Sequence, residues 1–133
     1  MRWRMTLALL MWLVLPGCGD ADRDLPSPYR HVAVPEAQLT SAAARERGRV
    51  LFEVNCALCH GVRGDGHGQR REGLDVPPRD FTAPDWKRRT SPRHVFFAIR
   101  EGLAGTPMPA WKSLSERDAW DLTAFLLSIE PRR

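Results

Sequence analysis

Apolar residues recur every three or four positions in three parts of the chain, residues 41–54, 92–101 and 115–130. That spacing is typical of helices with one buried face. Residues 61–90 contain five glycines and three prolines without a regular period, as a long loop would. No segment alternates between apolar and polar residues as a half-buried strand does. The pattern therefore predicts an all-α domain of three to four helices joined by long loops.

Capping signals support the second and third helices. Ser91 precedes Pro92, a residue favoured in the first turn, and Gly102 follows as a stop signal. Ser115 and Asp118 form a pair that resembles a capping box at the start of the last helix. The ends of both helices are thus marked by the sequence.

Gly48 lies inside the first predicted helix, where glycine costs about 1 kcal/mol relative to alanine. Close approach of another helix is the usual reason for such a glycine, so we expect a helix crossing there. The loop of residues 61–90 is long for so small a domain and needs something to pack against. A large flat cofactor would meet that need.

The N-terminus has the features of a bacterial export signal. Two arginines precede ten uncharged residues, 6–15, about half the length that a membrane-spanning helix requires. The stretch from Leu15 to Cys18 resembles a lipobox, in which the cysteine is lipidated and becomes the first residue of the mature chain. We expect a signal peptide over residues 1–17 and a lipid anchor at Cys18. A secreted protein with a free thiol at Cys18 is the alternative.

Residues 18–40 are predicted to be the anchor and a flexible tether, and residues 41–133 the folded domain. The segment from Gly19 to Leu39 has three prolines, scattered charges and no apolar period. A flexible chain of this length has a mean reach of about 25 to 29 Å. The expected location is the bacterial periplasm, at the outer face of the cytoplasmic membrane.

The amino-acid composition excludes fewer classes of function than the N-terminal sequence does. The 133 residues suffice for one domain, and 43% hydrophobic with 27% charged residues is ordinary for a globular protein. The net charge of +4 includes Arg2 and Arg4; without them, 18 basic and 16 acidic residues remain. An exported chain meets little nucleic acid, so nucleic acid is not an expected partner.

The segment Cys56-Ala-Leu-Cys59-His60 carries the clearest chemical signal. The pattern C-x-x-C-H is the attachment signature of c-type haem. Thioether bonds from Cys56 and Cys59 would hold the porphyrin, and Nε2 of His60 would bind the iron. The cysteine count agrees, because one lipidated and two haem-linked cysteines leave none free among three.

Three other interpretations of this motif meet objections. A thioredoxin-like dithiol follows a strand, whereas a helical pattern precedes Cys56 here. A zinc site needs four ligands, usually in two spaced pairs, and no second pair of cysteines exists. A disulfide between Cys56 and Cys59 leaves His60 unexplained.

Met108 is the candidate for the second iron ligand. Without the signal peptide it is the one remaining methionine, and it lies between Pro107 and Pro109, where no helix can form. A loop methionine that fills a gap is the alternative for this residue. His94 is the competing ligand, although its place in the second predicted helix is more typical of a surface histidine.

Taken together, these motifs resemble those of the small single-haem class I cytochromes c of bacteria, over residues 41–130. The resemblance rests on Gly48, Phe52 and Cys56 at four-residue steps, and on Leu122 and Phe125 in the last helix. In that family the first and last helices cross at the glycine. The stretch GTPMP matches the family's ligand loop, which implies that Met108 binds the iron.

The resemblance also implies a backbone contact and a function. A proline carbonyl accepts a hydrogen bond from the histidine Nδ1 in this family, and Pro78 or Pro77 would supply it. The expected function is that of a membrane-tethered carrier of one electron, not an enzyme. Expected partners are a quinol-oxidising complex, a terminal oxidase or a dehydrogenase. The alternatives are a haem subunit of a periplasmic dehydrogenase complex, or a haem enzyme or ligand binder with an open distal site.

Overall fold

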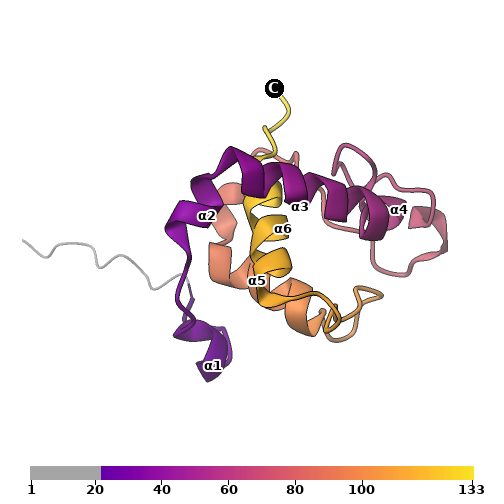
Figure 1. Cartoon of the computed structure of the whole chain (residues 1–133). Coiled ribbons are helices and arrows are strands. Elements are labelled where there is room, and N and C mark those ends of the chain that lie inside the picture. The colour runs from indigo at the N-terminus through magenta and orange to yellow at the C-terminus, as the bar shows by residue number, and fades with distance from the viewer. Residues whose placement is uncertain (1–21) are drawn as a thin grey trace, which may run out of the picture.

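The computed structural model describes residues 22–133 and shows a domain built of helices and loops (Figure 1). The helices are α1 (Ser27–Arg30), α2 (Glu36–Thr40), α3 (Ala42–Asn55), α4 (Ala57–His60), α5 (Pro92–Glu101) and α6 (Glu116–Ser128). Two 3₁₀ turns, Arg71–Gly73 and Lys87–Arg89, lie in the loop between α4 and α5. No strand occurs in residues 22–133, which confirms the all-α class, and α3, α5 and α6 lie where the apolar pattern predicts helices.

Serine side chains cap the start of all three long helices, as the sequence predicts for Ser91 and Ser115. The side chains of Ser41, Ser91 and Ser115 each accept a hydrogen bond from the backbone N–H three residues later, at 3.3, 3.2 and 3.1 Å. Each bond satisfies one of the N–H groups that lack a partner within the helix. Gly102 ends α5 with a φ of 71°, a conformation that favours glycine.

The crossing of α3 and α6 forms the centre of the domain (Figure 1). A Cβ at Gly48 would lie 2.0 Å from the backbone oxygen of Asp121, so glycine alone permits this approach. Phe52 of α3 is fully buried, and its ring centroid lies 5.3 Å from that of Phe125 of α6. The crossing expected at Gly48 is confirmed.

Residues 22–40, which we call the N-terminal strap, pack on the domain instead of extending as a flexible tether. Leu25 and Leu39 are buried in the strap, which contains α1 and α2. The ring of Tyr29 lies 4.9 Å from that of Phe97 on α5. The sequence analysis was wrong for this part of the tether, because irregularly spaced apolar residues give no period yet still bury surface.

The predictions for the first 21 residues cannot be compared with the structure. The signal peptide and the lipid anchor at Cys18 lie outside the described residues. Within residues 22–133, no helix combines the length and the apolar character needed to cross a bilayer.

Candidate functional site

The motif of two cysteines and a histidine forms the join between α3 and α4. The backbone N–H of Cys56 donates to Phe52 at the end of α3, at 2.8 Å, and the N–H of His60 donates to the carbonyl of Cys56, at 2.9 Å. The four-residue step therefore places Cys56 and His60 on one side of a helical turn. Both contribute to the lining of the same cavity.

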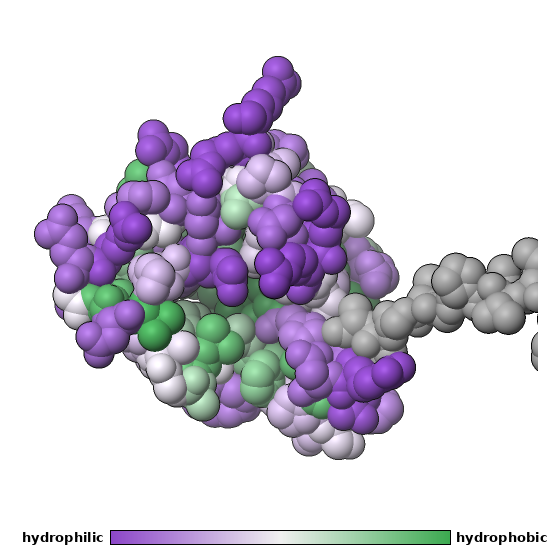
Figure 2. Space-filling model, turned by 180° about the vertical axis from the view of Figure 1, so that it is seen from behind, coloured by the Kyte–Doolittle hydropathy of each residue, from purple (hydrophilic) through white to green (hydrophobic). Residues whose placement is uncertain are grey.

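That cavity is otherwise almost entirely apolar. Met108 reaches it from the loop between α5 and α6, so two segments far apart in the sequence meet there. The remaining lining residues are Phe52, Phe81, Ile99, Trp111, Leu122 and Leu126. On the face drawn in Figure 2, hydrophobic surface borders a hollow and hydrophilic residues surround it. The structure thus brings together a thiol, an imidazole and a thioether in an apolar space.

The histidine ring is held by a backbone carbonyl. Nδ1 of His60 lies 3.0 Å from the carbonyl oxygen of Arg79. A carbonyl only accepts, so Nδ1 carries the proton and Nε2 keeps a free lone pair. Burial lowers the pKa of His60, and the bond to Arg79 opposes this without cancelling it. The neutral imidazole that a metal binds is therefore favoured near pH 7.

The prediction that Pro78 accepts this hydrogen bond was wrong by one residue. The carbonyl oxygen of Pro78 lies near Gly66 instead, and a Cβ added to Gly66 would be 2.9 Å from this oxygen. The φ of Gly66 is 76°. The carbonyl of Arg79, the next residue, faces His60 in its place. Pro77, the other candidate, does not make the bond either.

The glycine-rich loop after the motif is ordered by hydrogen bonds to α4. The N–H groups of Gly66, Gly68 and Arg70 donate to the carbonyls of His60, Cys59 and Leu58, at 2.8, 3.1 and 3.0 Å. These carbonyls have no partners within so short a helix, and the loop satisfies them. The loop therefore fixes the backbone of the motif, a role that its lack of periodicity did not reveal.

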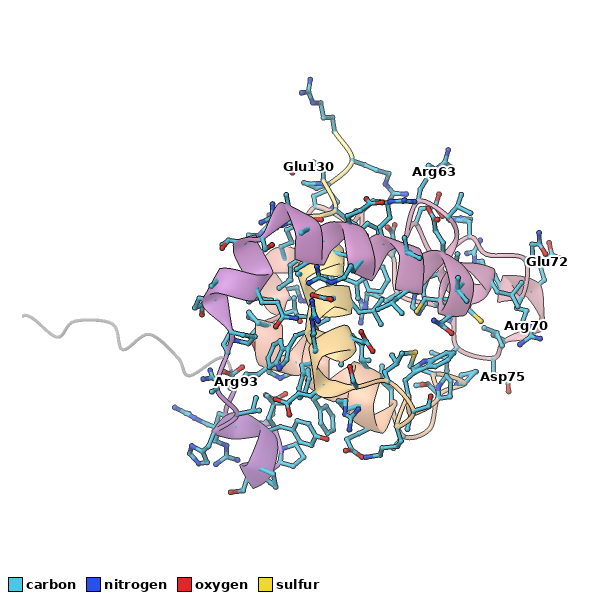
Figure 3. All side chains as sticks on the ribbon, viewed as in Figure 1. Arg63, Arg70, Glu72, Asp75, Arg93 and Glu130 are labelled. Carbon is cyan, nitrogen blue, oxygen red and sulfur yellow. The ribbon has the colours of Figure 1, made fainter. Side chains whose placement is uncertain are left out.

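The labelled charged residues of Figure 3 do not line the cavity. In Figure 3, Arg70, Glu72 and Asp75 point outward from the loop that follows α4. Arg93 lies elsewhere, beside the N-terminal strap, where it pairs with Asp22 at 2.9 Å. The cavity keeps its apolar walls as a result.

The two motif cysteines are free thiols in the structure, and both are partly buried. Burial, with a smaller contribution from Cys59, raises the pKa of the Cys56 thiol to about 12. The disulfide interpretation is thus not supported. The dithiol interpretation is not supported either, because helix α3, not a strand, precedes Cys56.

The positions of the side chains do not support a zinc site or His94 as the iron ligand. Among residues 22–133, no three or more His, Cys, Asp or Glu side chains come together as metal donors. His94 lies on α5 with Nε2 2.9 Å from the Asp24 carboxylate and Nδ1 3.0 Å from the Ser91 hydroxyl. It is therefore committed to the strap and is absent from the cavity lining.

Sequence reasoning missed one aromatic residue of the site. Phe81 lies against the ring of His60, with the ring centroids 4.8 Å apart and the planes inclined by 26°. A phenylalanine two residues after the hydrogen-bonding carbonyl was the available signal, but an isolated aromatic in a loop does not reveal what it contacts. Trp111 also lines the cavity, and Trp86 and Trp120 are buried in the core.

Comparison with known proteins gives a consistent result. The profile of the family described as cytochrome c oxidase, cbb3-type, subunit III matches residues 43–126. The chain is 33% identical over 91 residues to the cbb3-type cytochrome c oxidase subunit CcoP of Azospirillum brasilense, covering 68% of this chain and 30% of that protein. It is 28% identical over 100 residues to a thiosulfate dehydrogenase of Allochromatium vinosum, covering 71% of this chain and 35% of that enzyme.

The chain thus spans about a third of the length of each of these two relatives. Among solved structures, the KustC0563 c-type cytochrome is 28% identical, with a TM-score of 0.54. The similarity covers 62% of this chain and 96% of that one. Nearly the whole of that c-type cytochrome is thus similar to the domain described above.

Proposed function

The chain belongs to the family of cbb3-type cytochrome c oxidase subunit III, a family of c-type cytochromes, and on that basis we propose that it is a single-haem electron carrier tethered to the outer face of a bacterial cytoplasmic membrane. Its cofactor is covalently bound haem c, an iron centre that takes up and releases one electron. The roles of the individual residues and the tether are part of the proposal.

The meeting of His60 and Met108 in one apolar cavity is the observation that carries the proposal. Cys56 and Cys59 would form the two thioether bonds that hold the cofactor. Nε2 of His60, left unprotonated by the bond to Arg79, and the Met108 sulfur would both bind the iron. If the chain itself supplies both ligands, no place remains for a substrate, which favours a carrier over an enzyme.

The cavity walls support the same function. A thioether is a neutral, soft ligand that favours the reduced iron, and burial among apolar side chains disfavours the extra positive charge of the oxidised form. Phe52, Ile99 and Leu122 line the cavity without offering a charge. These residues would exclude water from the ligands and keep the potential high.

The partners follow from the relatives and the chain's own N-terminus. One relative is a subunit of a terminal oxidase and another is a dehydrogenase, so a quinol-oxidising complex, an oxidase or a dehydrogenase would exchange electrons with this domain. A haem subunit of a dehydrogenase complex is the second candidate function, since the thiosulfate dehydrogenase contains a region similar to most of this chain. The periplasmic location rests on the signal-like residues 1–17 and on Cys18.

Haem attachment and ligand exclusion test the proposal directly. The full chain, produced in a host that matures c-type cytochromes, is denatured and extracted with acid acetone. The proposal requires the colour to stay on the polypeptide, and the native protein to be low-spin and to refuse carbon monoxide. Extractable haem, or ready binding of carbon monoxide, contradicts the assignment of the cysteines or of Met108 respectively.

A further inference from the structure

Phe81 and the carbonyl of Arg79 both contact the ring of His60, one at its face and the other at Nδ1. The Arg79 oxygen lies near Nδ1 of His60, at 3.0 Å, and such a bond is strongest in the plane of the imidazole. The Phe81 ring covers a face of that imidazole, at 4.8 Å between centroids. Together they oppose both rotation of the histidine ring and its tilt.

Phe81 itself is held firmly. Its backbone N–H donates to the carbonyl of Gly64 at 2.7 Å. Its ring packs edge-on against Trp86, at 5.0 Å, and against Phe52, at 6.3 Å. Only 8% of Phe81 is exposed. Because Trp86 and Phe52 hold the Phe81 ring in place, this ring offers a rigid surface to the imidazole of His60.

We propose that Phe81 is a positioning residue for His60, which fixes the plane of the imidazole and keeps its Nδ1 aligned with the Arg79 carbonyl. This inference rests on the proposed function, in which His60 binds the iron. Because the hydrogen bond at Nδ1 makes Nε2 a stronger donor, a ring that drifts out of alignment becomes a weaker ligand. A weaker donor stabilises the oxidised iron less, so loss of Phe81 raises the potential.

The first measurement uses the unmodified protein. In its reduced, diamagnetic form, nuclear Overhauser contacts between the Phe81 ring and the His60 ring are expected. Their absence in a protein that carries haem and refuses carbon monoxide overturns the inference while leaving the proposed function intact. Haem that is not covalent, or an iron that His60 does not bind, removes the proposed function itself.

The second measurement compares Phe81→Met with Phe96→Met. Phe96 is also buried, with 4% exposed, but it stacks on Trp120 at 4.1 Å and does not line the cavity. Both variants lose a buried ring of the same size. We expect Phe81→Met to keep the haem and the low-spin spectrum, to raise the potential, and to shift the electron paramagnetic resonance g-values. Phe96→Met should lose stability with both properties unchanged.

Phe81→Tyr provides the conservative comparison, because it keeps the aromatic face and should retain the potential and g-values of the wild type. If Phe81→Met and Phe96→Met move the potential and g-values alike, or if neither does, Phe81 is only a core residue and the inference is wrong. If Phe81→Met does not accumulate, the nuclear Overhauser contacts between the Phe81 and His60 rings of the unmodified protein test the inference.

Discussion

The carboxylate of Asp121 on α6 is fully buried and accepts two hydrogen bonds from Arg47 on α3, at 2.7 and 3.0 Å. The side chain of Arg47 is 43% exposed, so the two partners of this ion pair differ in their access to water. Gln38 of the strap donates a further bond to the same carboxylate, at 2.8 Å. One acidic group therefore links α2, α3 and α6.

Removal of Arg47 should destabilise the fold more than removal of the carboxylate. Arg47→Ala leaves a buried charge with Gln38 as its donor and should lower the free energy of unfolding, because a buried carboxylate is costly once its main partner is removed. Asp121→Asn leaves Arg47 able to reach water and should cost less. Denaturant unfolding of both variants and of the double variant gives the coupling. Equal losses from the two single variants would contradict the asymmetry.

Acid should weaken attachment of the strap through Asp22. Burial alone would raise the pKa of this carboxyl, but hydrogen bonds from Ser91 and Arg93, with the charges of Arg93 and His94, hold the pKa below its ordinary value of 3.8. A lowered pKa in the folded state stabilises the fold above the unfolded pKa, and that contribution is lost as the pH falls through the folded value.

The measurement is the difference in unfolding free energy between the wild type and Asp22→Asn as a function of pH. This difference should favour the wild type at pH 7 and shrink as the pH falls below about 4. Asp75→Asn, a change at an exposed loop position, serves as the control and should show no such trend. A difference independent of pH would mean that Asp22 does not stabilise the strap by its charge.

Met108→Ala should separate haem attachment from iron ligation. The thioether bonds and His60 are untouched, so the variant should keep its haem after denaturation. With the sulfur gone, water can reach the iron, and the variant should lose the sulfur-to-iron charge-transfer band, fall in potential and bind carbon monoxide readily. Optical spectroscopy and a redox titration check this. An unchanged spectrum and potential would show that another group fills the position of Met108.

Cys18→Ser should release the protein from the membrane without altering its haem. The expected result is a soluble periplasmic cytochrome with the spectrum of the wild type, because the substitution leaves the haem motif and Met108 unchanged. Membrane fractionation followed by haem staining gives the answer. A wild-type protein that already fractionates as soluble would contradict the lipid anchor.

The helices could be predicted because their signals are local. Ser41, Ser91 and Ser115 cap the helices that the apolar period predicts, and Gly48 indicates the crossing through its cost within a helix. The motif at Cys56 likewise carries its chemistry within five residues. Such signals need no knowledge of the rest of the fold.

The errors concern contacts between segments far apart in the sequence. Whether the carbonyl of Pro78 or that of Arg79 faces His60 depends on the backbone conformation of the loop, and no side-chain pattern encodes that conformation. The strap was misjudged for a related reason. Tyr29 finds its partners on α5, roughly seventy residues away, so its own neighbours in the sequence give no sign of burial.

The docking of the strap limits how the domain can be presented to a partner. Three residues lie between Cys18 and Asp22, and the four steps from one to the other span at most about 14 Å in a fully extended chain. In Figure 1, α1 and α4 lie at opposite ends of the domain, so the chain enters at the end remote from His60. A lipid at Cys18 would keep the domain close to the bilayer, with α1 nearer to the membrane and His60 nearer to the aqueous side. Electrons would then leave toward partners that reach outward from the membrane.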